Sequence, residues 1–454
     1  MKDLTQGSIT RNIVALATPI AFGMIFQMLY YLVDLYFVAS LGDAAIAGVS
    51  AGGNLMLIVF ALTQVLGVGA VALISQAVGR KDQPAANLVF NQSIVLSAVL
   101  GVATLIGGYA FTRTYMSGIA ADAATVEAGV RYLHWFLPSM ALQFAMVAMA
   151  SALRGTGIVK PTMVVQVVTV VLNAILAPVL IVGWGTGHPM GVAGAGLASS
   201  IAVALGVAVL SVYFFKLEKY VGFHHEMWKP RMESWKRMLA IGLPAGGEFL
   251  LFFVFMAVIY WCIRGLGADA QAGFGIGSRI MQSIFLPAMA VAFAVGPIVG
   301  QSFGARQYGR VRQTFKHAIV ISSIIMIVLA LLVHVSPSLL VRGFTDDPEV
   351  LAVATVFLQI SSWNFVAQGL FFSSSSVFQG LGDTRPALLS TSMRLISFAA
   401  PASWMSRQPD FRIEYLWYLS VSAHLLQAMF SLWLVRMQFR RKLSPEPVPV
   451  SAPA

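Results

Sequence analysis

A polar stripe interrupts the first long apolar segment of this sequence. Four polar residues stand at positions i, i+3, i+4 and i+7, so that a helix would place them on one face: Gln27, Tyr30, Tyr31 and Asp34. A carboxylate at the centre of an apolar span costs about 2.5–3.5 kcal/mol on insertion scales, so it is kept for a function or for a partner. The neighbouring amide and hydroxyls can hydrogen-bond the Asp34 carboxyl in either protonation state. We therefore expect Asp34 to load and unload a proton, and the alternative is a structural Asp34 bonded to a helix end.

The composition places the stripe in a membrane protein. Hydrophobic residues make up 58% of the 454 residues and charged residues 10%, and the mean hydropathy is +0.80. A soluble domain needs more charge to cover its surface. The net charge of +11 follows from the membrane orientation rule and does not indicate nucleic-acid binding. The polar start MKDLTQGSITR is unlike a cleavable signal peptide, so we expect the first apolar segment to be retained as a span.

Twelve apolar runs are long enough to cross a bilayer. They cover residues 12–39, 46–77, 88–111, 131–152, 161–183, 190–215, 238–263, 270–302, 313–335, 350–378, 386–405 and 413–437. Most Lys and Arg residues fall at the two termini and in the even-numbered loops, while the opposite loops hold only Arg113, Arg131, Arg264, Arg342, Arg407 and Arg412. This bias predicts a multi-pass protein of the plasma membrane (the inner membrane of a bacterium) with both termini in the cytoplasm.

The second half of the chain repeats the first half 225 residues later. Pro19 corresponds to Pro244, Gln76 to Gln301 and Gly155 to Gly380, with no gap between these matches. Each repeat holds six spans, so both halves have the same membrane orientation, and a binding site is expected near the midplane between or within them. The predicted parts are an N-terminal six-helix lobe (1–215), a cytoplasmic linker (216–237), a C-terminal six-helix lobe (238–440) and a disordered cytoplasmic tail (441–454). The fold class is all-α and polytopic, and a self-contained pseudo-dimer is expected to work as a monomer.

Several motifs resemble those of multidrug and toxic compound extrusion (MATE) transporters. They are LISQAVGRKDQPAA, ALRGTGIVKPTM and NAILAPVLIVGWGTGHPMGVAGAGLA in the first half, and GLPAGGEFLLF, GPIVGQSFGARQ and FQGLGDTRPAL in the second. The resemblance covers about residues 5 to 440 in matching order. It implies two six-helix lobes around a V-shaped cavity, and export of organic cations or amphipathic drugs against an inward flow of H⁺ or Na⁺.

The resemblance also assigns roles to single residues. The family's span-1 aspartate falls on Asp34, and its bending proline falls on Pro19, which is either a proton-dependent hinge or a static kink. Asp34 has Ile259 at the repeat-equivalent position, so coupling is expected in the N-terminal lobe. The family's span-5 pattern Asn-x-x-x-Asp-Pro is matched at Asn173, but Ala177 replaces the aspartate. Losing that carboxylate favours H⁺ over Na⁺ without excluding Na⁺.

Other polar residues inside spans are candidates for substrate contact. Glu248 binds a cationic substrate, carries a second proton or pairs with Arg279, and the ion pair is the preferred interpretation. Gln368 mirrors Gln143 across the repeat, and both either line the cavity or bond neighbouring helices. Arg394, near a span end, is expected to extend to the interface.

No enzyme chemistry is predicted. The stretch RGTGIVK lacks the Gly-Lys-Ser/Thr ending of a phosphate-binding loop, and the pair His224-His225 has no further metal ligands nearby, so no cofactor and no metal are expected. The prediction is an ion-driven antiporter with Asp34 as protonation switch. Asn173, Tyr30 and Tyr31 would support it, and substrate contacts would come from the following set: Gln27, Asp34, Gln143, Glu248 and Gln368. The alternative is a flippase for a lipid-linked precursor, which would need a more cationic central cavity.

Overall fold

The structure, a computed structural model, describes residues 1–120 and 122–443, except the side chains of Tyr31, Asp34 and Leu35. Within this part of the chain every regular element is a helix. The first half contains α1 (Ile9–Ala39), α2 (Asp43–Gly53), α3 (Leu55–Gly79), α4 (Gln83–Ile119), α5 (Ala123–Gly155), α6 (Lys160–Ala177), η1 (Pro178–Val182) and α7 (Val192–Lys216). The second contains η2 (His225–Met227), α8 (Met232–Ile263), η3 (Arg264–Leu266), α9 (Ala268–Gly304), α10 (Tyr308–Val335), α11 (Pro337–Arg342), α12 (Pro348–Ser361), α13 (Asn364–Gly380), α14 (Arg385–Met405) and α15 (Ile413–Lys442).

The twelve predicted spans each correspond to one helix or to a pair of consecutive helices. Ten segments of the described chain are long and apolar enough to cross a membrane, and the pair α12 and α13, bent by 57°, makes an eleventh. The remaining predicted segment is α14, which packs against α8 and α15 in the same bundle. It is less apolar because it carries buried polar residues, among them Ser390, Thr391 and Arg394. The prediction of an all-α polytopic membrane protein is confirmed.

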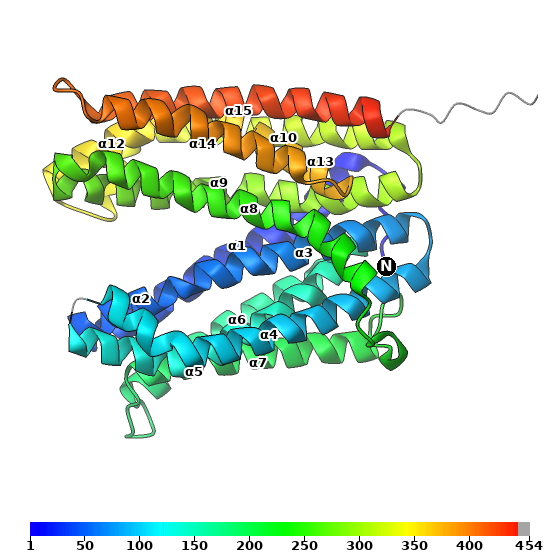
Figure 1. The fold of residues 1–454 in the computed structure, drawn as a ribbon, viewed down its shortest axis with the longest axis horizontal. Helices are drawn as coiled ribbons and strands as arrows, with labels where there is room; N and C mark the ends of the chain where they lie inside the picture. Colours follow the sequence, from blue (N-terminus) through cyan, green and yellow to red (C-terminus); the bar gives the residue numbers. More distant parts are fainter. Residues whose placement is uncertain (121, 444–454) are drawn as a thin grey trace, which may run out of the picture.

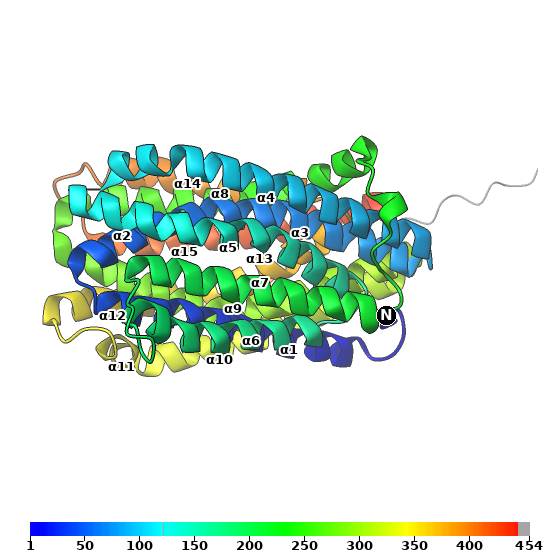
Figure 2. The same ribbon diagram turned by 90° about the horizontal axis from the view of Figure 1, so that it is seen from below.

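The helices form two halves that lie one above the other in Figure 1. We call α1–α7 the N-half and α8–α15 the C-half. Figures 1 and 2 show the long helices running roughly along one common axis. Within the N-half α5 packs against α4 and α7, and within the C-half α9 packs against α13, α12 and α10. The two six-helix lobes expected from the repeat are therefore present as two bundles.

The two halves meet mainly through α1, α3, α8 and α9. Contacts concentrate at the end of the bundle where α3, α5, α9 and α13 finish, which we call the joined end. The helix backbones approach closely there: a Cβ atom on Gly242 of α8 would collide with the carbonyl oxygen of Val65 on α3, and one on Gly69 with the carbonyl of Met238. Toward the other end the two halves diverge (Figure 1).

The segment between α7 and α8 is held on the surface of α4 at the joined end. The Asn91 side chain accepts from the backbone N–H of His224 at 2.9 Å and from Trp228 Nε1 at 3.0 Å, and Gln92 Nε2 donates to the carbonyl of Lys229 at 2.8 Å. The linker was predicted to extend to residue 237, but α8 already begins at Met232. At the C-terminal end, α15 continues to Lys442. Residues 444–454 of the predicted tail lie outside the described residues.

Candidate functional site

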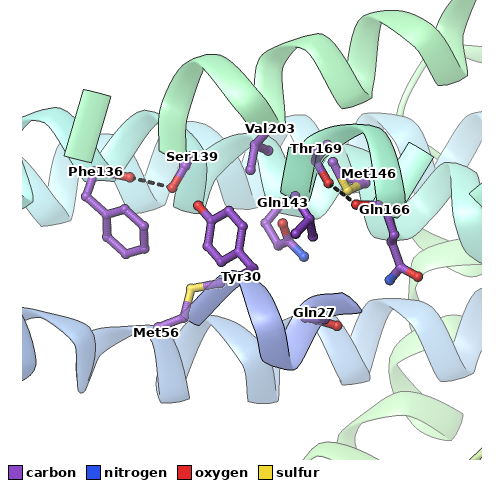
Figure 3. A pocket seen from close by; sticks show the side chains of 11 residues that line it. Gln27, Tyr30, Met56, Phe136, Ser139, Gln143, Met146, Gln166, Thr169 and Val203 are labelled. Atoms are coloured by element: carbon purple, nitrogen blue, oxygen red, sulfur yellow. Dashed lines mark hydrogen bonds between the residues drawn. The ribbon is translucent and has the colours of Figure 1, made fainter. Parts of the chain in front are cut away.

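A cavity of about 70 Å³ lies inside the N-half (Figure 3). Its lining comes from α1, α3, α5, α6 and α7: Gln27, Tyr30, Met56, Phe136, Ser139, Gln143, Met146, Gln166, Thr169, Val170 and Val203. Three residues that the sequence singled out, Gln27, Tyr30 and Gln143, are thus brought together. A water needs roughly 10–15 Å³ of such space, while pockets for drug-sized molecules measure about 300–1,000 Å³. In this conformation the cavity has room for a few waters or a small ion and is too small for a drug.

Helix spacing explains why these side chains share one cavity. Gln27 and Tyr30 are one turn apart on α1, as are Ser139 and Gln143 on α5. Ser139 Oγ donates to the carbonyl of Phe136 at 2.9 Å, so its hydroxyl hydrogen is already used within its own helix. The Gln27 and Gln143 amides carry no charge, and the lining combines neutral hydrogen-bonding groups with aromatic and methionine surface.

Beside the cavity, Pro138 interrupts the backbone hydrogen bonds of helix α5. A proline has no N–H to donate to the carbonyl four residues earlier, and this carbonyl, of His134, instead accepts from the hydroxyl of Tyr109 on α4 at 3.0 Å. One residue further, the N–H of Ser139 donates to Ser200 Oγ of α7 at 3.2 Å, and the same hydroxyl donates to the carbonyl of Trp135 at 2.5 Å. Side chains from two neighbouring helices thus satisfy the backbone groups released at Pro138.

The two residues at the centre of the predicted coupling site lie partly outside this description. The backbone of Tyr31 and Asp34 belongs to α1, but their side chains are outside the described residues. Their roles stay predictions, as does the role of Pro19 as a hinge, because α1 runs through Pro19 as one continuous helix.

Asn173 is fully buried on α6, one turn beyond Thr169 of the cavity lining. Neither Nδ2 nor Oδ1 of its amide has a hydrogen-bond partner in the described part of the chain. A buried polar group without a partner typically costs about 1–3 kcal/mol. Within the described residues this amide is therefore unsatisfied, and it lies next to the N-half cavity.

A second, smaller cavity of about 30 Å³ lies in the C-half around Glu248. It is lined by Glu248, Phe249, Met289, Ala292, Phe293, Phe372, Ser375, Ser376 and Gln379. Ser375 Oγ lies 3.0 Å from Oε2 and 3.3 Å from Oε1 of Glu248, and it donates its hydrogen to this carboxyl group. The cavity thus combines one carboxyl group with three phenylalanine rings.

The preferred interpretation of Glu248, an ion pair with Arg279, is wrong. No such pair is present among the ion pairs of the described residues, and Arg279 is exposed on α9. The helical register of α9 turns Arg279 outward, so that the neighbour of Glu248 is the serine run of α13. Gln368, also on α13, is buried but lines neither cavity, and its Oε1 has no partner within the described residues.

The expectation for Arg394 is also wrong. Its side chain does not extend to an interface but is 2% exposed, with the guanidinium 4.7 Å from the centre of the Phe255 ring and Nη1 at 3.2 Å from Nε2 of His424. His424 was not among the candidate residues that the sequence indicated. The available signal was that Arg394 and His424 both lie well inside neighbouring apolar runs, where a basic group needs a partner.

No metal centre is formed: within the described residues no three His, Cys, Asp or Glu side chains come together in a way that could hold a metal ion. Among the described residues the site has two parts. One is a cavity in the N-half with uncharged lining residues, next to the Asn173 amide that has no partner there. The other is an acidic, aromatic cavity in the C-half.

Comparison with known proteins gives a consistent set of similarities. The MatE family profile matches residues 19–179 and 244–405, once in each half. The chain is 26% identical to the probable multidrug resistance protein YoeA of Bacillus subtilis over 369 residues, 80% of each chain. It is 26% identical to the multidrug export protein MepA of Staphylococcus aureus over 372 residues, 82% of this chain and 81% of that one.

Solved structures show the same fold. A MOP superfamily transporter from Pyrococcus furiosus superposes with a TM-score of 0.90 at 23% identity and covers 98% of both chains. The outward-facing conformation of a multidrug resistance MATE family transporter also has a TM-score of 0.90 at 23% identity, over 97% of this chain and 98% of that chain.

Proposed function

Because this chain belongs to the MatE family, we propose that it is an ion-gradient-driven antiporter that exports organic cations or amphipathic drugs. Support comes from the relatives, which are named as multidrug resistance and multidrug export proteins, and from the chemistry of the two cavities. Aromatic rings attract organic cations, and methionine adapts to ligands of different shapes. Few directional groups and much adaptable surface suit a transporter of many substrates.

The coupling site we propose consists of Asp34, Asn173, Tyr30 and Tyr31, with H⁺ as the favoured ion. The observation that carries this proposal is the N-half cavity, because Gln27 and Tyr30 of the α1 stripe line it and Asp34 follows Tyr30 by one helical turn. The Asn173 amide, which has no partner among the described residues, supports a small polar ligand in this region. Ala177 at the place of a family carboxylate removes one hard oxygen ligand that Na⁺ would favour.

Protonation would act through the charge of Asp34. A proton arriving from outside removes the negative charge, weakens the attraction for a cationic substrate and changes the hydrogen bonds that the stripe prefers. Pro19 provides the hinge, since it donates no hydrogen bond to the carbonyl of Ala15 and so weakens α1 at that turn. The change in charge and the weak turn together would reshape the N-half cavity.

Glu248 is the proposed site for the positive charge of the substrate in the C-half. Its carboxyl group is oriented by Ser375 and surrounded by the rings of Phe249, Phe293 and Phe372. A carboxylate with aromatic walls fits a flat organic cation. Gln27 and Gln143 would supply neutral hydrogen bonds on the opposite side.

The orientation we propose has both termini in the cytoplasm of a bacterial cell whose inner membrane holds the protein, and a monomer as the working unit. The basic residues of the N-terminus, of the α7–α8 segment and of the C-terminal end of α15 lie at the joined end, and basic residues favour the cytoplasmic side. The joined end is then cytoplasmic, and this conformation faces outward.

A flippase for a lipid-linked precursor is the second candidate. It would require basic groups in the central cavity to bind phosphate. Arg394 is buried in the C-half and engaged by Phe255 and His424, and the guanidinium of Arg154 lies over the Phe293 ring, 5.4 Å from its centre. Among the described residues no basic side chain lines either cavity, which favours the antiporter.

The test is transport of a fluorescent organic cation by purified protein in proteoliposomes, driven separately by ΔpH and by a Na⁺ gradient. We expect ΔpH to drive transport and Asp34→Asn to abolish it. The matched control is Asp43→Asn, the same chemical change at an exposed position of α2. Transport driven by Na⁺ alone, or wild-type transport by Asp34→Asn, would contradict the proposed coupling.

A further inference from the structure

Two glutamines form reciprocal bonds between the halves at the joined end. Gln76, near the end of α3, donates through Nε2 to the carbonyl of Gly380 at the end of α13, at 2.9 Å. Gln301, near the end of α9, donates through Nε2 to the carbonyl of Gly155 at the end of α5, at 3.0 Å. The two donors are 225 residues apart, and so are the two acceptors. The internal repeat has therefore produced a two-fold related pair of bonds, each running from one half to the other.

Glycines allow the backbones to come this close. Gly79 faces the carbonyl of Gln301, and its repeat partner Gly304 faces the carbonyl of Gln76. A Cβ atom at either position would overlap with the facing carbonyl, so any other residue would force the halves apart. The joint at these four residues thus consists of backbone surfaces and neutral amides, with no interlocked large side chain and no ion pair among them.

The N-terminal segment breaks this symmetry. Leu4 is fully buried in the apolar core between the halves, and its N–H donates to Oε1 of Gln301 at 2.9 Å. Arg310 of α10 donates to three carbonyls of the same segment: Leu4 at 3.0 Å, Gln6 at 3.0 Å and Gly7 at 3.0 Å.

The same segment is also tied to the N-half. The N–H of Lys2 donates to the carbonyl of Thr156, just after α5, at 2.8 Å. Residues 2–7 therefore cross the joint, with bonds to Thr156 and Asn12 in the N-half and to Gln301 and Arg310 in the C-half. They cover Gln301, which is completely buried, whereas Gln76 is half-buried.

We propose that Gln76 and Gln301 are the gate residues of the joined end and that residues 2–7 are a latch which holds the Gln301 side closed. An alternating-access transporter has to separate this end once per cycle. Neutral amide–carbonyl bonds suit this task because each has only a modest net free energy and both partners find water when the halves part. The latch adds the burial of Leu4 and the charge-assisted bonds of Arg310, so it shifts the conformational equilibrium toward the joined state.

Inter-half distances measure this equilibrium directly. Spin labels at Lys160→Cys in the N-half and Gln313→Cys in the C-half, both at exposed positions near the joined end, would be used in full-length protein with Cys262→Ser, without substrate. Pulsed electron spin resonance in lipid nanodiscs gives the populations of short and long distances. Because no transport is involved, the outcome is independent of the proposed coupling ion and substrate.

We expect the long-distance population to rise at least threefold in Arg310→Met and in Leu4→Ser. Gln301→Ala should open the joint more than Gln76→Ala, because Gln301 also binds the latch. The matched control is Arg312→Met, since Arg312 is exposed on the same helix and, within the described residues, donates to the carbonyl of Leu443 and not to the latch. If Gln301→Ala does not fold, Gln301→Asn shortens the side chain by one methylene and tests the same two bonds. Unchanged populations in Arg310→Met and Leu4→Ser, equal effects of the two glutamine variants, or an equal shift in Arg312→Met would each overturn the proposal.

Discussion

Arg394 and His424 form a hydrogen bond of 3.2 Å between Nη1 and Nε2 inside the C-half. A guanidinium only donates, so Nε2 of His424 accepts, and the ring hydrogen is on Nδ1, which donates to the carbonyl of Ser420 at 2.7 Å. The Phe255 ring covers the guanidinium of Arg394. Nε of this guanidinium has no hydrogen-bond partner in the described residues. This arrangement surrounds a buried charge with an aromatic face and one neutral acceptor, and the carboxyl group of Glu248 also acts on it electrostatically.

Stability is expected to depend on this pair. His424→Ala removes the neutral acceptor of a hydrogen bond from a buried charge, which typically costs about 1.5–3 kcal/mol. We expect a clearly lower midpoint of thermal unfolding in detergent. Ser422→Ala, at an exposed position of the same helix, should change the midpoint little. Wild-type stability of His424→Ala would show that Arg394 does not need this acceptor.

The interruption of the α5 backbone hydrogen bonds at Pro138 leads to a second prediction about stability. Ser200→Ala removes the hydroxyl that serves both the N–H of Ser139 and the carbonyl of Trp135. Leaving a buried donor and acceptor unpaired costs about 1–3 kcal/mol each, so unfolding should shift to lower temperature or denaturant. Ser211→Ala on the same helix is the control, because Ser211 Oγ donates to the carbonyl of its own helix at Val207 and its contact with α5 is a weak one, 3.7 Å to Sδ of Met149. Equal effects of the two variants would contradict the bridging role of Ser200.

Replacing Asn173 is expected to affect transport and stability differently. Its amide is buried without a partner in the described part of the chain, so Asn173→Leu should leave stability unchanged or raise it by about 1–3 kcal/mol, while ion-driven transport should be lost. Thermal unfolding and proteoliposome transport are measured on the same preparation. Val171→Leu, at a half-exposed position of α6, is the control for added volume. Loss of stability together with transport would identify Asn173 as a structural residue.

Glu248 is expected to select for positive charge. Glu248→Gln keeps the size of the side chain and its carbonyl acceptor but removes the charge, so binding of an organic cation should weaken at least tenfold, or about 1.4 kcal/mol. A neutral amphipathic ligand should bind as before. Fluorescence titration of both ligands checks this, with Glu233→Gln on the exposed start of α8 as control. Equal weakening for both ligands would mean that Glu248 shapes the cavity and does not select charge.

Asp122, outside the membrane-spanning segments, is expected to make the stability of the fold depend on pH. It caps α5 and accepts from the N–H of Thr125 at 2.7 Å, and this bond holds the pKa of the Asp122 carboxyl below its usual value. A lowered folded-state pKa contributes stability above the unfolded value, roughly pH 3.9, which is lost as the pH falls through the folded value. The difference in unfolding midpoint between wild type and Asp122→Asn should therefore shrink as the pH decreases from 6 to 3. A constant difference over this range would contradict it.

Much of the fold could be predicted because it depends on local features of the chain. Apolar runs of about 20 residues require helices in a bilayer, since only a helix satisfies its own backbone there. The correspondence of Gln76 with Gln301, and of Gly155 with Gly380, is also visible in the sequence alone. Helical spacing placed Gln27 and Tyr30 on one face, and the structure lines one cavity with both.

The partners of buried polar groups were decided only by the tertiary structure. Periodicity tells which residues share a helix face, but it does not tell which helix that face meets or at what height. Glu248 was assigned to Arg279 on the next helix in the sequence, yet it contacts Ser375 on α13. The bond between Arg394 and His424 depends in the same way on the packing of α14 against α15. Amide donors and carbonyl acceptors are common along the chain, so the sequence does not show which of them pair. A hydrogen bond requires a distance of about 3 Å between donor and acceptor. Only the packing of the helices brings Gln76 and Gln301 within that distance of carbonyls in the opposite half.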